Sequence, residues 1–217
     1  MEISYICSLG QSCHVGMILK RNKLKLASYP FDWTFSNFKN ILHCIQDKFN
    51  IFLDKSYYLS VCHGTLGGHR FYDSNRHIFN HHDPLVNESH YTYFVRCVDR
   101  FNTLLVNSEH KLFVTMITNT VEVNQAIIDE IIEFNSKFKE CTNNYTLLCI
   151  VHIPNKSENF HKFTKIDCVD ILELHTTNGS NGTSFNNEKD DTYLDTILNT
   201  QYNFNLKPIP PTLSTNA

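Results

Sequence analysis

Long apolar runs are absent from this sequence of 217 residues, and none approaches the ~18 residues that a membrane-spanning helix requires. The start, MEISYICSLG, carries Glu2 where a secretory signal would carry basic residues, and no long apolar segment with a small-residue cleavage site follows. We therefore expect a soluble, cytoplasmic protein that does not associate with membranes.

An excess of basic residues is also missing. Lys and Arg number 19 against 22 Asp and Glu, which gives a net charge of -3 and a pI of about 6.4. Such a chain offers no cationic footprint for a phosphate backbone, so nucleic-acid binding is not expected.

The eight cysteines include no CxxC pair. Scattered cysteines in a chain that looks intracellular favour reduced thiols over a disulfide framework. Six of the twelve histidines fall between residues 63 and 90, beside Cys62, but no zinc spacing such as HExxH or CxxC occurs. We therefore expect loop histidines, and neither a metal nor another cofactor.

Hydrophobic spacing predicts strands that alternate with helices. Strands are expected at 2–7, 111–118, 145–154 and 168–177, and helices at 12–22, 36–49, 91–106, 123–139 and 192–204, with Ser12 and Ser36 as N-caps. The pattern predicts a single three-layer α/β domain over 1–205 with a mainly parallel sheet. Within it, 54–90 is expected to be a His- and Gly-rich loop insertion with a short hairpin. Residues 206–217 are expected to form a disordered tail.

Two places in this domain could carry chemistry, because ligands of open α/β sheets gather beyond the carboxyl ends of the strands. The loop after the first strand carries Ser8, Gln11 and Cys13. His175 stands at the end of the strand 168–177. If both strands are parallel, Cys13 and His175 lie on the same edge of the sheet.

Cys13 falls at the start of a helix, where the macrodipole favours a thiolate. Backbone N–H groups there, together with the Gln11 amide, are able to hold an oxyanion, and a histidine would act as the base. The alternative is a buried structural thiol, which describes most cysteines.

Several segments carry a resemblance to a known family. SLGQSC, LKLASYPFDW, HHD and FVRCVDRFNTLL, in this order before the strand KLFV, resemble a family of uncharacterised bacterial and viral proteins described as papain-like cysteine peptidases. The family pattern is SLGxxC, SYPFDW, an FxHD segment and a helix with RxxRF. This chain matches it at Ser8, Leu9, Gly10, Cys13, Ser28, Tyr29, Pro30, Phe31, Asp32, Trp33, Phe79, His82, Asp83, Arg100 and Phe101, with one extra residue between Phe79 and His82.

The resemblance implies that Cys13 is a nucleophile with a histidine partner, in a cysteine peptidase. Whether the substrate is a peptide, an ester or glycan-linked stays open. His82, which Asp83 follows, fits the family motif, whereas His175 fits the predicted sheet edge, and both remain open. The name conflicts with the predicted fold, because a papain-like fold places its cysteine on a long helix facing a separate β half.

Two other functions compete with a thiol hydrolase. Ser8 directly follows the first strand, as the serine does in SGNH-type esterases, although the Gly-Asp pair expected around such a serine is absent. A non-catalytic module that binds a glycan or a protein is the other. Asp32 is expected to be a buried structural carboxylate, bonded to backbone or to an arginine such as Arg96 or Arg100, with substrate positioning as the alternative role.

Overall fold

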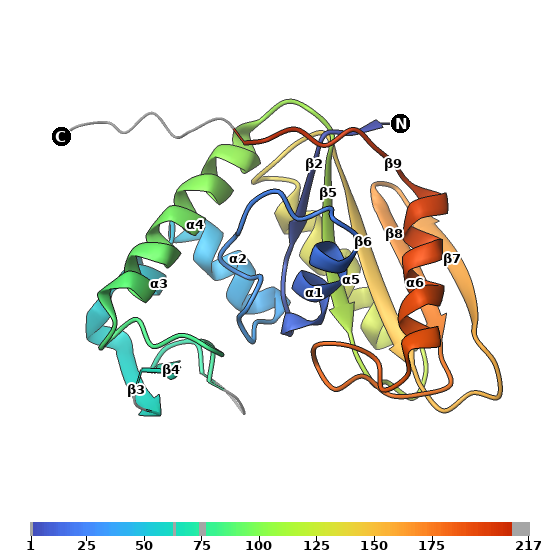
Figure 1. Cartoon of the computed structure of the whole chain (residues 1–217). Helices are drawn as coiled ribbons and strands as arrows, with labels where there is room; N and C mark the ends of the chain where they lie inside the picture. The colour runs from blue at the N-terminus through green and yellow to red at the C-terminus, as the bar shows by residue number, and fades with distance from the viewer. Residues whose placement is uncertain (1, 63, 74–76, 210–217) are drawn as a thin grey trace.

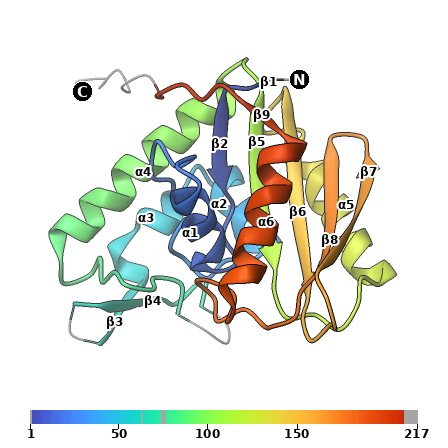
Figure 2. The same ribbon diagram turned by 45° about the vertical axis from the view of Figure 1, so that its right-hand side comes forward.

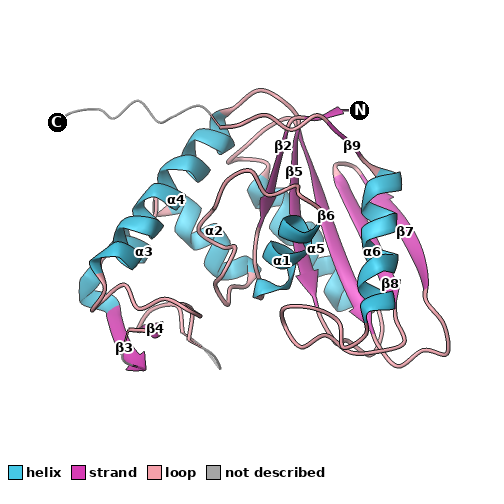
Figure 3. Cartoon of the chain, in the orientation of Figure 1, coloured by secondary structure: helices cyan, strands magenta, loops and turns pink. Residues whose placement is uncertain are grey.

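A mostly parallel sheet lies at the centre of the computed structural model, which describes residues 2–62, 64–73 and 77–209. Its strands run in the order β2 (Tyr5–Ser8), β5 (Lys111–Ile117), β6 (Tyr145–Ile153), β8 (Val169–His175) and β7 (Phe160–Ile166). The first four are parallel, and β7 pairs antiparallel with β8. The carboxyl ends of the parallel strands therefore share one edge (Figure 3). The expected α/β fold with a mainly parallel sheet is confirmed.

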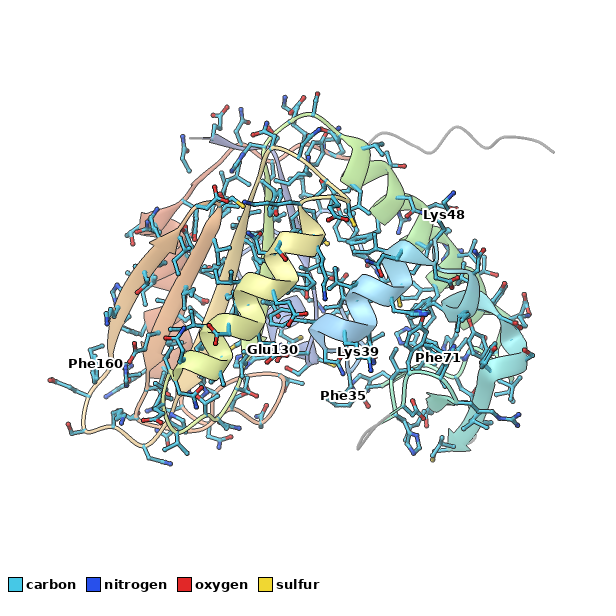
Figure 4. The ribbon with its side chains drawn as sticks, turned by 180° about the vertical axis from the view of Figure 1, so that it is seen from behind. Phe35, Lys39, Lys48, Phe71, Glu130 and Phe160 are labelled. Carbon is cyan, nitrogen blue, oxygen red and sulfur yellow. The ribbon has the colours of Figure 1, made fainter. Side chains whose placement is uncertain are left out.

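Helices cover both faces of this sheet (Figure 1). One face packs against α1 (Cys13–Arg21) and α6 (Glu188–Gln201), which lie in front of the sheet in Figure 2. The other packs against α2 (Phe38–Gln46), α3 (Asn50–Leu53), α4 (Glu88–Val106) and α5 (Gln125–Phe138). Seen from behind, α2 and α5 run side by side (Figure 4). Burial on both faces explains why β6 reads as a continuous apolar run.

Segment 54–90 adds a 3-10 turn, η1 (Lys55–Tyr57), and the predicted short hairpin, formed by β3 (Tyr58–Cys62) and β4 (Leu66–His69). At the other end of the chain, β9 (Asn203–Phe204) pairs with β1 (Glu2–Ile3). Lys207 N then donates to Ser4 O at 2.9 Å, so the chain follows β1 beyond the expected end of the domain at 205. The rest of the expected tail, 210–217, lies outside the described residues.

Helix boundaries and caps agree with the sequence in part. Ser12 caps α1 by accepting from His14 N, as predicted. The cap of α2 is Asn37 rather than Ser36, because the Asn37 side chain accepts from Asn40 N at 2.8 Å. The last helix begins at Glu188, four residues earlier than expected, with acidic side chains in its first turn where the helix dipole favours them.

A close contact joins α1 to the loop that carries SYPFDW. A Cβ added to Gly16 would lie 2.8 Å from Asp32 O and 3.4 Å from the Trp33 ring, so only glycine lets the loop approach. The Asp32 carboxylate is fully buried and accepts from Tyr29 N at 2.9 Å and from Lys25 Nζ. The backbone bond was expected, but the cation is Lys25 and not Arg96 or Arg100.

None of the helices in the described ranges is long and apolar enough to cross a membrane.

Replacing Lys25 by methionine tests how much the Lys25–Asp32 ion pair contributes to the stability of the fold. The Lys25 side chain is 12% exposed and Asp32 is 0% exposed, so the variant would leave a buried carboxylate without its cation. We expect Lys25→Met to lower the free energy of unfolding by about 3 kcal/mol. Urea unfolding followed by circular dichroism measures it. The double variant Lys25→Met/Asp32→Asn should recover part of the loss, and Lys23→Met, at an exposed site nearby, should cost little. Equal losses for Lys25→Met and Lys23→Met would contradict the assignment.

Candidate functional site

The loop between β2 and α1 is held in an unusual backbone conformation. Gly10 and Gln11 have φ angles of 79° and 74°, in the left-handed region, which a residue other than glycine rarely adopts. Ser36 fixes this turn, because its Oγ accepts from Gln11 N and donates to Leu9 O, both at 3.2 Å. Strain of this kind is often stored at functional sites. Ser36, expected as a helix cap, instead shapes the loop that leads to Cys13.

Cys13 is the first residue of α1 and is only 2% exposed. The Asn80 side-chain amide donates to its Sγ at 3.7 Å. Burial raises the pKa of the Cys13 thiol, and this effect outweighs the opposing hydrogen bonds from Asn80 and from the backbone. The resting group is therefore a protonated thiol, and a base has to remove its proton before it can attack a carbonyl.

His81 lies one amide group away from this thiol. Asn80 Nδ2, which donates to Cys13 Sγ, is also 3.1 Å from His81 Nε2. Because the amide nitrogen can only donate, His81 Nε2 is the acceptor in this contact, and its lone pair faces the amide. The His81 ring is exposed, and its φ of 67° is left-handed. The sequence placed His81 only among possible metal ligands, and its position next to the family-motif histidine was the one signal available.

His82 lies on the same loop but faces elsewhere. Its Nδ1 donates to Asn80 O at 3.3 Å, and its ring stacks on Tyr93 at 4.9 Å. Burial lowers the pKa of His82. The following Asp83 accepts from Leu85 N and Val86 N and so caps its own loop. Among the described residues, no hydrogen bond joins Cys13 to a histidine.

His175 lies at the sheet edge, as predicted, but far along it. β5 and β6 separate β8 from β2, and three strand spacings amount to about 14 Å. The His175 ring stacks on Phe160 at 3.9 Å, and its Nε2 is 2.8 Å from Glu173 Oε1. The structure therefore brings Cys13 together with the 80–82 loop and not with His175.

Gln11 lines a cavity of about 420 Å³ at the carboxyl edge of the sheet, which we call the edge cavity. Ser12, Asn119 and Ser180 share its wall, and none of its lining residues is charged. Ser8, in contrast, is fully buried, and its Oγ accepts from Gly10 N at 3.2 Å. Ser8 thus supports the turn from inside and does not face this cavity.

Three residues that the sequence did not suggest meet beside the edge cavity. Ser180 Oγ lies 2.8 Å from His14 Nδ1, and His14 Nε2 lies 3.7 Å from Asp191 Oδ1. The His14 ring is fully buried, and its Nε2 makes no hydrogen bond within the described ranges. The serine and the aspartate lie more than 160 residues from His14 in sequence, so no local motif could have linked them.

No group of three or more His, Cys, Asp or Glu side chains among the described residues is arranged to hold a metal ion. His63 lies outside those residues. All eight cysteines are free thiols.

Comparison with models of known families finds a match over part of the chain. Residues 4–66 match the model of the family described as "Putative papain-like cysteine peptidase (DUF1796)", which confirms the resemblance over β2, α1, the SYPFDW loop and the first part of the hairpin. The 80–82 loop and α4 lie outside the matched residues. No curated protein and no solved structure matches the chain.

Because His14 and His152 are buried in their neutral forms, we predict that acid destabilises the fold. Burial, with smaller contributions from Arg21 and His152, lowers the pKa of His14 to about 3, and burial lowers the pKa of His152 to about 4. In the unfolded chain both pKa values are near 6.5. At a pH between the folded and the unfolded pKa values, the unfolded chain binds more protons than the folded protein. The contribution of each neutral histidine to the free energy of unfolding is therefore fully present above pH 6.5 and is lost as the pH falls. We expect a loss of about 2 kcal/mol per histidine between pH 6.5 and 4.5.

Urea titrations at several pH values measure this dependence. His14→Gln and His152→Gln should each flatten the slope of unfolding free energy against pH below 6.5. A slope identical to that of the unchanged protein in both variants would contradict the prediction.

Proposed function

From the family match over residues 4–66 and the surroundings of Cys13, we propose that the protein is a thiol-dependent hydrolase of acyl bonds with Cys13 as its nucleophile. The observation that supports this most directly is the Asn80 amide, which contacts both Cys13 Sγ and His81 Nε2. A thiol, an amide and an imidazole are thereby gathered at the start of a helix, beside a strained loop. These are the groups that nucleophilic acyl transfer requires.

The reaction begins with a neutral thiol. When substrate enters, the Asn80 amide moves aside and His81 Nε2 takes the proton of Cys13. The sulfur attacks the acyl carbonyl, and the Gln11 amide and the N–H groups of the first turn of α1 stabilise the oxyanion. His81 then returns the proton to the leaving group, which departs and leaves a thioester. Water hydrolyses that thioester and restores the thiol.

His82 is the alternative base, because its ring is hydrogen-bonded to the backbone carbonyl of the same residue, Asn80. Its proton-bearing Nδ1 is already engaged there, and its ring is held against Tyr93. The exposed and less restrained His81 is therefore the better candidate.

A second candidate function uses serine. Ser180 Oγ faces a buried imidazole at 2.8 Å, and a carboxylate lies on the far side of that ring, in the order serine, histidine, aspartate. Ser180 lines the edge cavity, whereas Ser8 does not. A serine esterase in this chain would therefore use Ser180 rather than Ser8.

Hydrolysis of p-nitrophenyl acetate by single variants separates these possibilities. We expect Cys13→Ala to abolish hydrolysis and His81→Ala to lower kcat about 10²-fold or more, because a general base contributes that much. His82→Ala should cost less. His175→Ala and Ser180→Ala should leave the rate unchanged, and they serve as controls because they alter the same edge of the sheet.

Three other outcomes would contradict, in turn, the nucleophile, the base and the enzymatic activity proposed here. If Ser180→Ala abolishes hydrolysis and Cys13→Ala does not, the serine site replaces the thiol site. If His82→Ala has the largest effect among the histidine variants, His82 is the base. If the folded protein, checked by circular dichroism, hydrolyses neither this ester nor a fluorogenic dipeptide amide, the non-catalytic binding module is the better description.

A further inference from the structure

We propose that a second cavity binds a small molecule that carries a phosphate group. This cavity, which we call the basic cavity, has a volume of about 640 Å³ and lies between the end of α1, the loop that follows it and α4. It belongs to neither the edge cavity nor the thiol. Among the residues that line it are Lys20, Lys25, Ser28, Trp33, His82, Tyr93 and Arg100.

Positive charge dominates the basic cavity. Lys20, Lys25 and Arg100 line it, and no acidic side chain does. Lys25 is neutralised by Asp32 beneath it, but within the described ranges neither Lys20 nor Arg100 has an acidic partner. Although the chain has a net charge of -3, the charges of Lys20 and Arg100 are therefore not compensated by an acidic side chain in the basic cavity.

Arg100 is available to bind an anion. The hydrogen bond of its guanidinium is a long one, 3.5 Å from Nη1 to Ser28 O. A planar guanidinium binds phosphate through two parallel N–H donors, and such charge-assisted bonds are stronger than neutral ones. Lys20, which also lines the basic cavity, supplies a second positive charge.

Aromatic rings complete the wall. Trp33 comes from the loop, Tyr93 from α4 and His82 from the 80–82 loop, with His82 and Tyr93 stacked at 8° between their planes. Flat apolar faces next to two cations suit an organic group attached to a phosphate better than a bare hydrated ion.

The basic cavity also gathers residues that the proposed hydrolysis leaves without a role. Ser28 and Trp33 come from the loop after α1, Arg100 comes from α4, and all three line this cavity. Helix α1 connects the two places, because Lys20 lies seven residues, or about 10 Å, beyond Cys13.

The chain contains a single tryptophan, Trp33, so tryptophan fluorescence comes from one ring in the wall of this cavity. The protein is titrated at constant ionic strength with inorganic phosphate, with adenosine monophosphate and with adenosine. We expect a saturable change with the two phosphates and none with adenosine. Arg100→Gln should weaken binding about tenfold or more, as loss of a charged hydrogen-bonding partner does. Arg96→Gln is the matched control, since Arg96 is exposed one turn earlier on α4 and does not line the cavity.

Lys20→Gln provides a second variant and should also weaken binding. Absence of a saturable change with either phosphate would overturn the proposal, and so would equal effects of Arg96→Gln and Arg100→Gln. Binding of adenosine as tight as that of its monophosphate would assign the cavity to the ring instead of the phosphate. Cys13→Ala should bind the phosphates normally, so this test and that of the thiol hydrolase can fail independently.

Discussion

The contact of Gly16 with the Asp32 carbonyl and the Trp33 ring is the constraint on which both candidate sites depend. Because no side chain stands at Gly16, the loop lies directly on α1, and the Asp32 carboxylate is buried beneath Lys25. This contact fixes α1, which carries Cys13 at one end and Lys20 at the other. The chain that leaves the loop then reaches Ser36, which clamps the Gly10–Gln11 turn. A single loop therefore sets the entrance of α1 and supplies a wall of the basic cavity.

Burial of Cys13 constrains any chemistry at this site. A helix N-terminus stabilises a thiolate, but removing the sulfur from water costs more, so the thiol stays protonated. The base must therefore act during the reaction. The fold sharpens this point, because the sheet is parallel and α1 spans only nine residues, unlike the long helix and separate β half of a papain-like fold. The family description fits the first strand, turn and helix in sequence, and does not extend to the architecture.

Hydrophobic periodicity was sufficient to predict the three layers and the parallel strands, and the residue type at the start of the first helix predicted the Ser12 cap. It failed for β7, whose side chains are nearly all exposed and include His161, Lys162 and Lys165, so this edge strand has no apolar pattern to detect. At the site, the rule that parallel strands end at one edge of the sheet placed the β2–α1 loop and His175 correctly on the same edge. That rule does not say how far apart two residues lie along the edge. His81 and the Ser180–His14 contact depend on loop conformations and on pairings between distant residues, which spacing does not encode.

Cys13 and His14 are neighbours, yet they belong to different sides of the molecule. Successive residues of a helix point about 100° apart, so Cys13 meets Asn80 in the 80–82 loop whereas His14 meets Ser180 and Phe185 before α6. His14 Nδ1 is committed to Ser180, and His14 therefore does not serve the thiol as a base. The thiol and serine mechanisms therefore need substrates that approach the first turn of α1 from directions about 100° apart. Only the Cys13 side continues along the helix past Gly16 toward Lys20 and the basic cavity, so an acyl substrate with a phosphate group would favour the thiol.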